Sequence, residues 1–122
     1  MKKILIVDDS EMTRNFHSYI LKNSDFVVLD AEDGAEALEK LYKEKDDIGL
    51  VLTDINMPNM NGYTLIEKIR GNNEMDNIVI GIISTLDEQI DKEKGYEKGV
   101  DFYFVKPVDP EELIESIEMI LE

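Results

Sequence analysis

The sequence predicts an α/β protein built on a doubly wound parallel sheet, and three observations support this fold class. Short apolar runs recur along the 122 residues, and they lack the polar alternation of strands that face water on one side. Apolar residues between these runs recur at helical spacing. Polar side chains directly follow four of the five runs, at the edge where an open parallel sheet binds its ligands.

Five strands are expected at the apolar runs, which are rich in β-branched, leucine and aromatic residues. These runs cover residues 4–7, 26–29, 50–52, 78–83 and 102–105. Repeated strand–helix units have right-handed crossovers, and for five strands the common order is 2-1-3-4-5, the flavodoxin-like (βα)5 topology. In this order residues 30–34 form a turn after an edge strand.

Helices are expected between and after the strands, each with an apolar stripe facing the sheet. The stripes are Met12, Phe16, Tyr19 and Ile20; Ala35, Leu38, Leu41 and Tyr42; Leu65, Ile66 and Ile69; and Leu113, Ile114, Ile117, Ile120 and Leu121. Pro110 suits the first turn of the last helix, with Asp109 as its cap. The stretch 87–98 has only Ile90 and Tyr96 as large apolar residues, so we expect a lightly packed helix there. His17 is expected at an exposed position.

Composition limits the function classes. Lys and Arg total 13 against 28 Asp and Glu, a formal net charge of −15, which argues against direct nucleic-acid binding or an anionic membrane surface. The absence of cysteine excludes disulfides, thiolate metal sites and cysteine nucleophiles. Carboxylates appear too early for a signal peptide or membrane insertion. With no linker or repeat, residues 1–122 are predicted to form a single cytoplasmic domain.

The residues that follow the strands indicate chemistry. Asp8 and Asp9 follow the first strand, Asp54 the third, Ser84 the fourth and Lys106 the fifth. Three carboxylates on neighbouring strands repel one another by about 3 kcal/mol per pair at about 5 Å, and a cation relieves this repulsion. Oxygen ligands without His or Cys favour Mg²⁺, with Mn²⁺ as a substitute.

The same set of residues is typical of phosphoryl transfer. Mg²⁺ held by few carboxylates completes its shell with phosphate oxygens, and Lys106 and the Ser84 hydroxyl could contact the same phosphoryl group. A carboxylate can itself be the nucleophile and form an aspartyl-phosphate. Asp54 is the candidate, because it stands alone after the central strand whereas Asp8 and Asp9 form an acidic pair.

These residues closely resemble the receiver domain of two-component response regulators, particularly single-domain regulators of the chemotaxis type. The resemblance covers essentially the whole chain. It rests on IVDDS at 6–10, TDINMPNMNG at 53–62, Ser84, and YFVKP at 103–107. Together, in this order and spacing, these motifs are far more specific than any one of them.

The resemblance implies a role for each matching residue. Asp54 matches the phosphoacceptor, Asp9 the direct Mg²⁺ ligand, and Asp8 the partner that reaches the ion through water. Asn56 matches the residue whose backbone carbonyl completes the metal site. Lys106 matches the lysine that contacts the phosphoryl oxygens, and Ser84 and Tyr103 match the switch hydroxyl and switch aromatic.

The resemblance also implies a signalling protein rather than an enzyme. Its partners would be a histidine kinase or phosphotransfer protein and a downstream protein target. Phosphorylation would shift the population between two packings and change the surface formed by the fourth helix, fifth strand and fifth helix. Both a motor regulator and an intermediate of a phosphorelay are compatible with these residues.

Two positions depart from the usual pattern of the family. Thr85 stands where Ala or Gly is usual, and Leu86 where a polar residue is frequent, so both are candidates for the mouth of the site. The resemblance leaves open whether Ser84 or Thr85 is the switch hydroxyl. We favour Ser84, because it keeps the usual spacing, 30 residues after Asp54 and 22 before Lys106.

Two other function classes share part of this pattern. A phosphatase of the haloacid-dehalogenase type also uses an aspartate nucleophile and Mg²⁺, but it needs a second aspartate as general acid where this chain has Asn56. A flavin binder on the same fold needs a phosphate loop rich in Ser, Thr and Gly after the first strand. The acidic residues in that loop would repel the phosphate.

Overall fold

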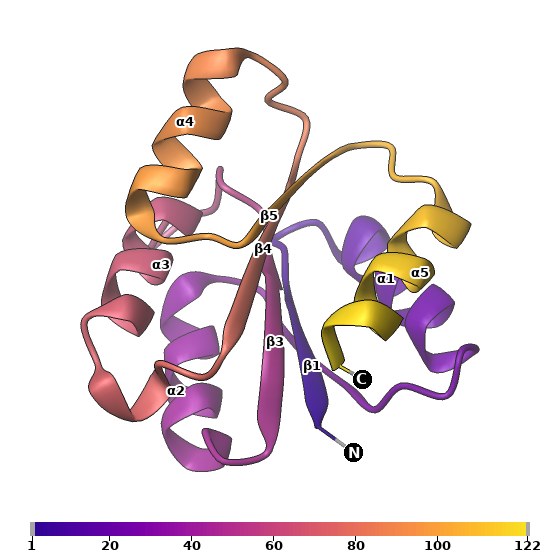
Figure 1. Cartoon of the computed structure of the whole chain (residues 1–122), viewed down its shortest axis with the longest axis horizontal. Helices are drawn as coiled ribbons and strands as arrows, with labels where there is room; N and C mark the ends of the chain where they lie inside the picture. Colours follow the sequence, from indigo (N-terminus) through magenta and orange to yellow (C-terminus); the bar gives the residue numbers. More distant parts are fainter. Residues whose placement is uncertain (1, 122) are drawn as a thin grey trace.

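The computed structural model describes residues 2–121, in which five parallel strands form one sheet with helices on both faces (Figure 1). The strands are β1 (Lys3–Val7), β2 (Val28–Ala31), β3 (Ile48–Thr53), β4 (Val79–Ser84) and β5 (Phe102–Val105). Their order is β2-β1-β3-β4-β5, so the fold class and strand order predicted from the sequence are confirmed.

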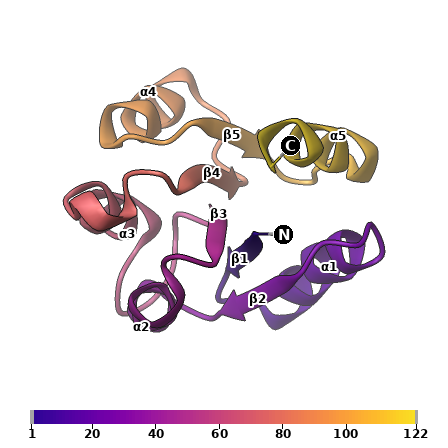
Figure 2. The same cartoon turned by 60° about the horizontal axis from the view of Figure 1, so that its bottom comes forward.

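The helices are α1 (Glu11–Lys22), α2 (Gly34–Glu44), α3 (Gly62–Arg70), α4 (Gln89–Lys98) and α5 (Pro110–Leu121), with a 3-10 turn, η1, at Asn73–Met75. Figure 2 shows α1 and α5 on one face of the sheet and α2, α3 and α4 on the other. No helix of residues 2–121 is long and apolar enough to cross a membrane.

Two apolar clusters hold the layers together. Side chains of a strand alternate between the faces, so Leu5 and Val7 pack toward α2 and α3 whereas Ile4 and Ile6 pack toward α1 and α5. Both faces of β1 are therefore buried. This explains the unbroken apolar runs of the sequence.

Polar caps set where the helices begin, and hence where the preceding loops end. The side chains of Ser10, Asp33 and Asn61 accept hydrogen bonds from the first turns of α1, α2 and α3 respectively. Such caps satisfy N–H groups that have no partner within the helix. These caps fix the ends of the loops that follow β1, β2 and β3.

The prediction for the second strand was displaced by two residues. It was expected at 26–29, but β2 is Val28–Ala31, because β1 pairs Ile4 with Val28 and Val7 with Ala31. Asp30 therefore lies within the strand, and Asp33 caps α2 through the backbone N–H of Glu36.

The stripe predicted for the first helix was largely wrong. Met12 and Tyr19 are 83% and 68% exposed, and Phe16 is also exposed. The buried face of α1 consists of His17, Ser18, Ile20 and Leu21. The spacing alone fits either stripe, and packing of α1 against the sheet and α5 selects the face that contains His17.

The remaining stripes agree better with the structure. Leu65, Ile66 and Ile69 of α3 are fully buried, as are Leu113 and Ile117 of α5. In α2, Leu38 and Leu41 are buried but Ala35 and Tyr42 are exposed. Gly95 is the single buried residue that the structure describes in α4, which confirms light packing there.

Candidate functional site

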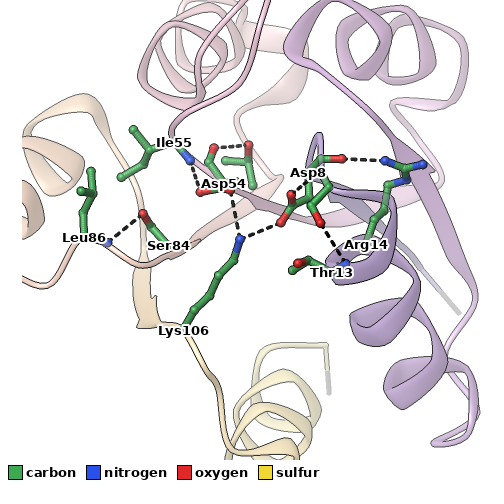
Figure 3. A network of polar contacts seen from close by, with 10 residues as sticks. Asp8, Thr13, Arg14, Asp54, Ile55, Ser84, Leu86 and Lys106 are labelled. Carbon is green, nitrogen blue, oxygen red and sulfur yellow. Dashed lines mark hydrogen bonds and ion pairs between the residues drawn. The ribbon is translucent and has the colours of Figure 1, made fainter.

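The carboxyl ends of the strands bring the candidate residues to one edge of the sheet. Asp8 and Asp9 follow β1, Asp54 follows β3, Ser84 ends β4 and Lys106 follows β5. Because the strands are parallel and β1 lies beside β3, their loops meet at the same edge. Figure 3 shows the ammonium of Lys106 directed between Asp8 and Asp54.

Three carboxylates form an acidic cluster at this edge. One oxygen each of Asp8, Asp9 and Asp54 lies within 4.8 Å of the others, and among residues 2–121 this is a group that could hold a metal ion. Asp8 is buried, Asp54 is half-buried and Asp9 is exposed. Three carboxylates, of which Asp9 is open to solvent, fit a hard divalent cation such as Mg²⁺.

Lys106 neutralises part of this negative charge. Its ammonium donates to Asp8 Oδ2 at 2.8 Å and to Asp54 Oδ2 at 3.0 Å, and its side chain is only 15% exposed. Burial acts to lower the pKa of Lys106, but the hydrogen bonds to the two carboxylates outweigh burial and raise it. The lysine is therefore charged at neutral pH.

Asp54 is held by both of its carboxylate oxygens. Oδ2 accepts from Lys106, and Oδ1 accepts from the backbone N–H of Ile55 at 2.7 Å. Burial raises the pKa of the Asp54 carboxyl above its usual range, although Lys106 opposes this effect. The two hydrogen bonds fix the orientation of the carboxylate at the edge of the sheet.

Asp8 positions the loop between β1 and α1. Its Oδ1 accepts from the Ser10 N–H at 2.9 Å, and its backbone carbonyl accepts from the Arg14 guanidinium at 2.8 Å. Arg14 also lies 3.4 Å from Asp30 at the end of β2. These contacts hold the acidic loop while the exposed Asp9 remains open to a ligand.

Ser84 and Tyr103 both contact Leu86 in the loop that leads to α4. The buried hydroxyl of Ser84 accepts from the Leu86 N–H at 3.1 Å, and the Tyr103 hydroxyl donates to the Leu86 carbonyl at 2.6 Å. Burial raises the pKa of Tyr103 to about 12. Leu86 thus joins the end of β4 to β5.

The other predicted residues lie around this centre. Asn56 is exposed in the loop after Asp54, and Thr85 is exposed between Ser84 and Leu86. Leu86 is half-buried against the apolar cluster on the α2–α4 face. Thr85 and Lys106 also line a cleft beside α1, together with Phe16 and His17.

Arg14 was not among the predicted site residues, and the prediction that His17 is exposed was wrong. His17 is 3% exposed, and burial, followed by the charge of Lys106, lowers its pKa. Their spacing carried a usable signal: Arg14, His17 and Leu21 recur at helical intervals after the acidic pair, so they share one face of α1.

The fold and the site together define the class of the protein: the chain belongs to the response regulator receiver domain family, whose family model matches residues 4–118. Receiver domains of this family are signalling modules of two-component systems. The motif-based prediction of this family is thereby confirmed.

Two relatives show which kinds of response regulator the chain is similar to. The chain is 38% identical over 120 residues to the chemotaxis protein CheY1 of Helicobacter pylori, covering 98% of this chain and 96% of CheY1. It is 37% identical to the transcriptional regulatory protein PhoP of Bacillus subtilis, covering 98% of this chain but 48% of PhoP. The chain thus spans about half the length of that relative.

Solved structures show the same architecture. The chemotaxis response regulator CheY4 of Vibrio cholerae superposes with a TM-score of 0.90 at 31% identity, with 98% of each chain covered. CheY from Borrelia burgdorferi, in a CheX–CheY–BeF3–Mg complex, gives a TM-score of 0.90 at 30% identity, covering 99% of this chain and 90% of that one.

Proposed function

We propose that this chain is a phosphorylation-controlled signalling switch in which Asp54 accepts a phosphoryl group from the phosphohistidine of a kinase or phosphotransfer protein. The observation that carries the proposal is the placement of Lys106 between Asp8 and Asp54, with Asp9 exposed beside them. This arrangement offers one oriented nucleophile, a fixed positive charge and a candidate cation site at one point.

The transfer forms one bond to phosphorus and breaks another. An Asp54 carboxylate oxygen forms the new bond to phosphorus while the phosphorus–nitrogen bond to the donor imidazole breaks, and the imidazole leaves with its electron pair. Lys106 is placed to neutralise charge on the phosphoryl oxygens. Such positioning and charge neutralisation account for most of the catalysis of phosphoryl transfer.

Asp9, Asp54 and the backbone carbonyl of Asn56 would hold Mg²⁺, with Asp8 reaching it through water. The cation would supply charge neutralisation for the incoming phosphoryl group. Asp8 and Lys106 form an ion pair. This pair compensates part of the negative charge of the carboxylates before a cation binds.

The switch itself would use the contacts of Leu86. When the Ser84 hydroxyl turns toward a phosphoryl group on Asp54, its bond to the Leu86 N–H is lost, and the loop held by Tyr103 changes its packing. A phosphoryl group can shift this equilibrium only by binding one packing better than the other. The affected surface would be α4, β5 and α5, where a downstream protein binds.

Three further features belong to the proposal. Residues 1–122 act as one receiver domain, the protein works in the cytoplasm, and it contacts proteins rather than nucleic acid or membrane. The relative in the complex with CheX supports a protein partner. The haloacid-dehalogenase alternative gains no support, because the exposed Asn56 has no acidic proton to donate.

The test is phosphorylation by acetyl phosphate with MgCl₂, measured by intact mass. We expect one added phosphoryl group in wild type and none in Asp54→Asn. Asp76→Asn is the matched control, because Asp76 is exposed next to η1, and it should be phosphorylated like wild type. Wild type that takes up no phosphoryl group under these conditions contradicts the proposal.

A further inference from the structure

The helix α4 buries little of its own surface, and polar contacts connect it to α3. Gly95 is its one buried residue among those described, so apolar burial contributes little to its position. Lys98 forms an ion pair with Glu67 of α3 at 2.9 Å, and the Tyr63 hydroxyl of α3 donates to the Asp91 carbonyl of α4 at 3.2 Å. The position of α4 therefore depends on a few identifiable contacts.

Tyr63 contacts α4 both with its hydroxyl and with its ring. The ammonium of Lys94 lies 4.6 Å from the ring centroid, within the range of a cation–π interaction. The Tyr63 side chain is large, and the residue is only 9% exposed, so it lies between α3 and α4 rather than in solvent.

The start of α3 is fixed to the Asp54 loop, residues 54–61, through Gly62, the residue before Tyr63. The N–H of Gly62 donates to the Ile55 carbonyl at 2.8 Å. A Cβ placed on Gly62 would lie 2.1 Å from the Asp54 carbonyl oxygen, so the start of α3 is pressed directly against the backbone of Asp54. A displacement of this backbone therefore moves the residue before Tyr63.

We propose that Tyr63 is a positioning residue that couples the Asp54 loop to α4, forming a second connection beside the one from Ser84 through Leu86 to Tyr103. This inference rests on the proposed function, because it concerns the response of α4 to phosphorylation. The first connection runs through β4 and β5, whereas the second runs through α3.

The two connections meet beneath α4. The Tyr103 ring approaches Gly95, where an added Cβ would lie 3.5 Å from Tyr103 Cδ2, and Tyr63 holds the preceding turn at Asp91. The pKa of Tyr103 is raised first by burial and then by the nearby Tyr63. The helix is thus held by two tyrosines from different elements.

Hydrogen–deuterium exchange of α4 in two states tests the coupling. Peptides covering residues 89–98 are compared without donor and with acetyl phosphate and MgCl₂, and intact mass gives the phosphorylated fraction. Tyr63→Phe removes only the hydroxyl and keeps the ring. We expect exchange in unphosphorylated α4 to rise about fivefold, the value for one net hydrogen bond, and the difference between the two states to fall at least twofold.

Tyr42→Phe is the matched control, because Tyr42 is exposed on α2, and it should behave like wild type in both states. If Tyr63→Phe changes exchange by the same factor in both states, Tyr63 is merely structural and the coupling is wrong. The coupling is also wrong if Tyr103→Phe alone abolishes the whole difference, or if phosphorylated wild type shows no difference in α4. Failure of wild type to be phosphorylated instead overturns the proposed function.

Discussion

At the edge of the sheet a single ammonium, that of Lys106, faces the carboxylates of Asp8 and Asp54. Its side chain is partly buried, and the pKa of the lysine is raised despite this burial. The ammonium of Lys106 is therefore charged at neutral pH, and β5, which ends directly before Lys106, sets its position. A change of charge on Asp54 would therefore directly change its electrostatic interaction with the Lys106 ammonium.

Lys106→Arg should separate phosphorylation from the response to it. The guanidinium keeps the charge but replaces a compact group by a planar fork, so it cannot reproduce both short contacts. We expect Asp54 still to be phosphorylated, while the difference in α4 hydrogen exchange between the two states falls at least several-fold. Lys68→Arg, at an exposed position of α3, serves as control. A normal α4 response in Lys106→Arg would contradict the role of Lys106.

His17 should make folding stability depend on pH. Its pKa in the folded protein lies below the ordinary value because it is buried and faces Lys106, so the folded state disfavours the charged form. The contribution of neutral His17 to the free energy of unfolding is therefore fully present above the unfolded pKa of about 6.5. It is lost as the pH falls through the pKa of His17 in the folded protein.

We therefore expect the free energy of unfolding of wild type to fall more steeply from pH 7.5 to 5.5 than that of His17→Gln. Urea titrations in metal-free buffer measure both. His17 is the single histidine of the chain, so the difference between the two proteins reports on this group. Parallel curves would show that His17 is not held neutral by its surroundings.

Thr85 and Leu86 should control how long the phosphoryl group persists. Hydrolysis needs a water in line with the phosphorus–oxygen bond. Thr85 is bulkier than the Ala or Gly that is usual in the family, and Leu86 offers no polar group to orient that water. We expect faster decay of the phosphorylated form in Thr85→Ala and Leu86→Glu than in wild type, measured by intact mass after donor removal. Unchanged or slower decay would contradict this role and would reopen the choice between Ser84 and Thr85 as the switch hydroxyl.

Among the elements, α3 begins at a tightly constrained position. Gly62 starts this helix after the cap Asn61, and the Asp54 carbonyl occupies the place that a side chain would need. The loop from Asp54 to Asn61 is further held by Asn59, whose amide donates to Asp33 at 2.8 Å. The start of α3 therefore restrains the backbone of Asp54.

Gly62→Ala should both destabilise the fold and displace Asp54. Overpacking of this kind typically costs about 1–3 kcal/mol, and here the contact atom is backbone, which cannot move aside like a side chain. Thermal unfolding and the phosphorylated fraction measure the two effects. Gly71→Ala is the control, because the nearest atom to its added Cβ, the Glu67 carbonyl oxygen, lies at 3.2 Å. An equal loss in both variants would show that the Asp54 contact is not special.

At the scale of the whole molecule, a net charge of −15 acts on top of the local acidic cluster. Self-repulsion of a highly charged chain destabilises its compact state, and salt screens this effect. NaCl should therefore raise the melting temperature of every variant alike, whereas Mg²⁺ should act through the cluster of Asp8, Asp9 and Asp54.

Asp9→Asn distinguishes the two effects. A ligand at ten times its Kd stabilises by about 1.4 kcal/mol, so Mg²⁺ should raise the melting temperature of wild type by roughly 5 °C and that of the variant by much less. The metal-free variant should melt above wild type, because one repelling carboxylate is gone. Asp76→Asn with NaCl of equal ionic strength completes the comparison. Equal Mg²⁺ shifts in wild type and Asp9→Asn would contradict the metal assignment.

Local sequence determined the fold class, the strand order and the set of residues at the edge of the sheet. Unbroken apolar runs require burial on both faces, and the polar residues after them can then lie only at the carboxyl ends of the strands. The motifs around Asp8, Asp54 and Lys106 were sufficient to identify the receiver family. Roles within the site, such as Asn56 as a metal ligand, remain predictions.

Tertiary structure decided between alternatives that the local sequence patterns allow equally well. The first helix carries two overlapping stripes, and only packing against the sheet and α5 shows that His17 is buried while Met12 and Phe16 are exposed. Pairing with β1 shifts β2 by two residues. The contacts of Tyr63 with α4 and of Gly62 with Asp54 join segments distant in the chain. Periodicity describes one element at a time, so contacts between elements follow only from the assembled fold.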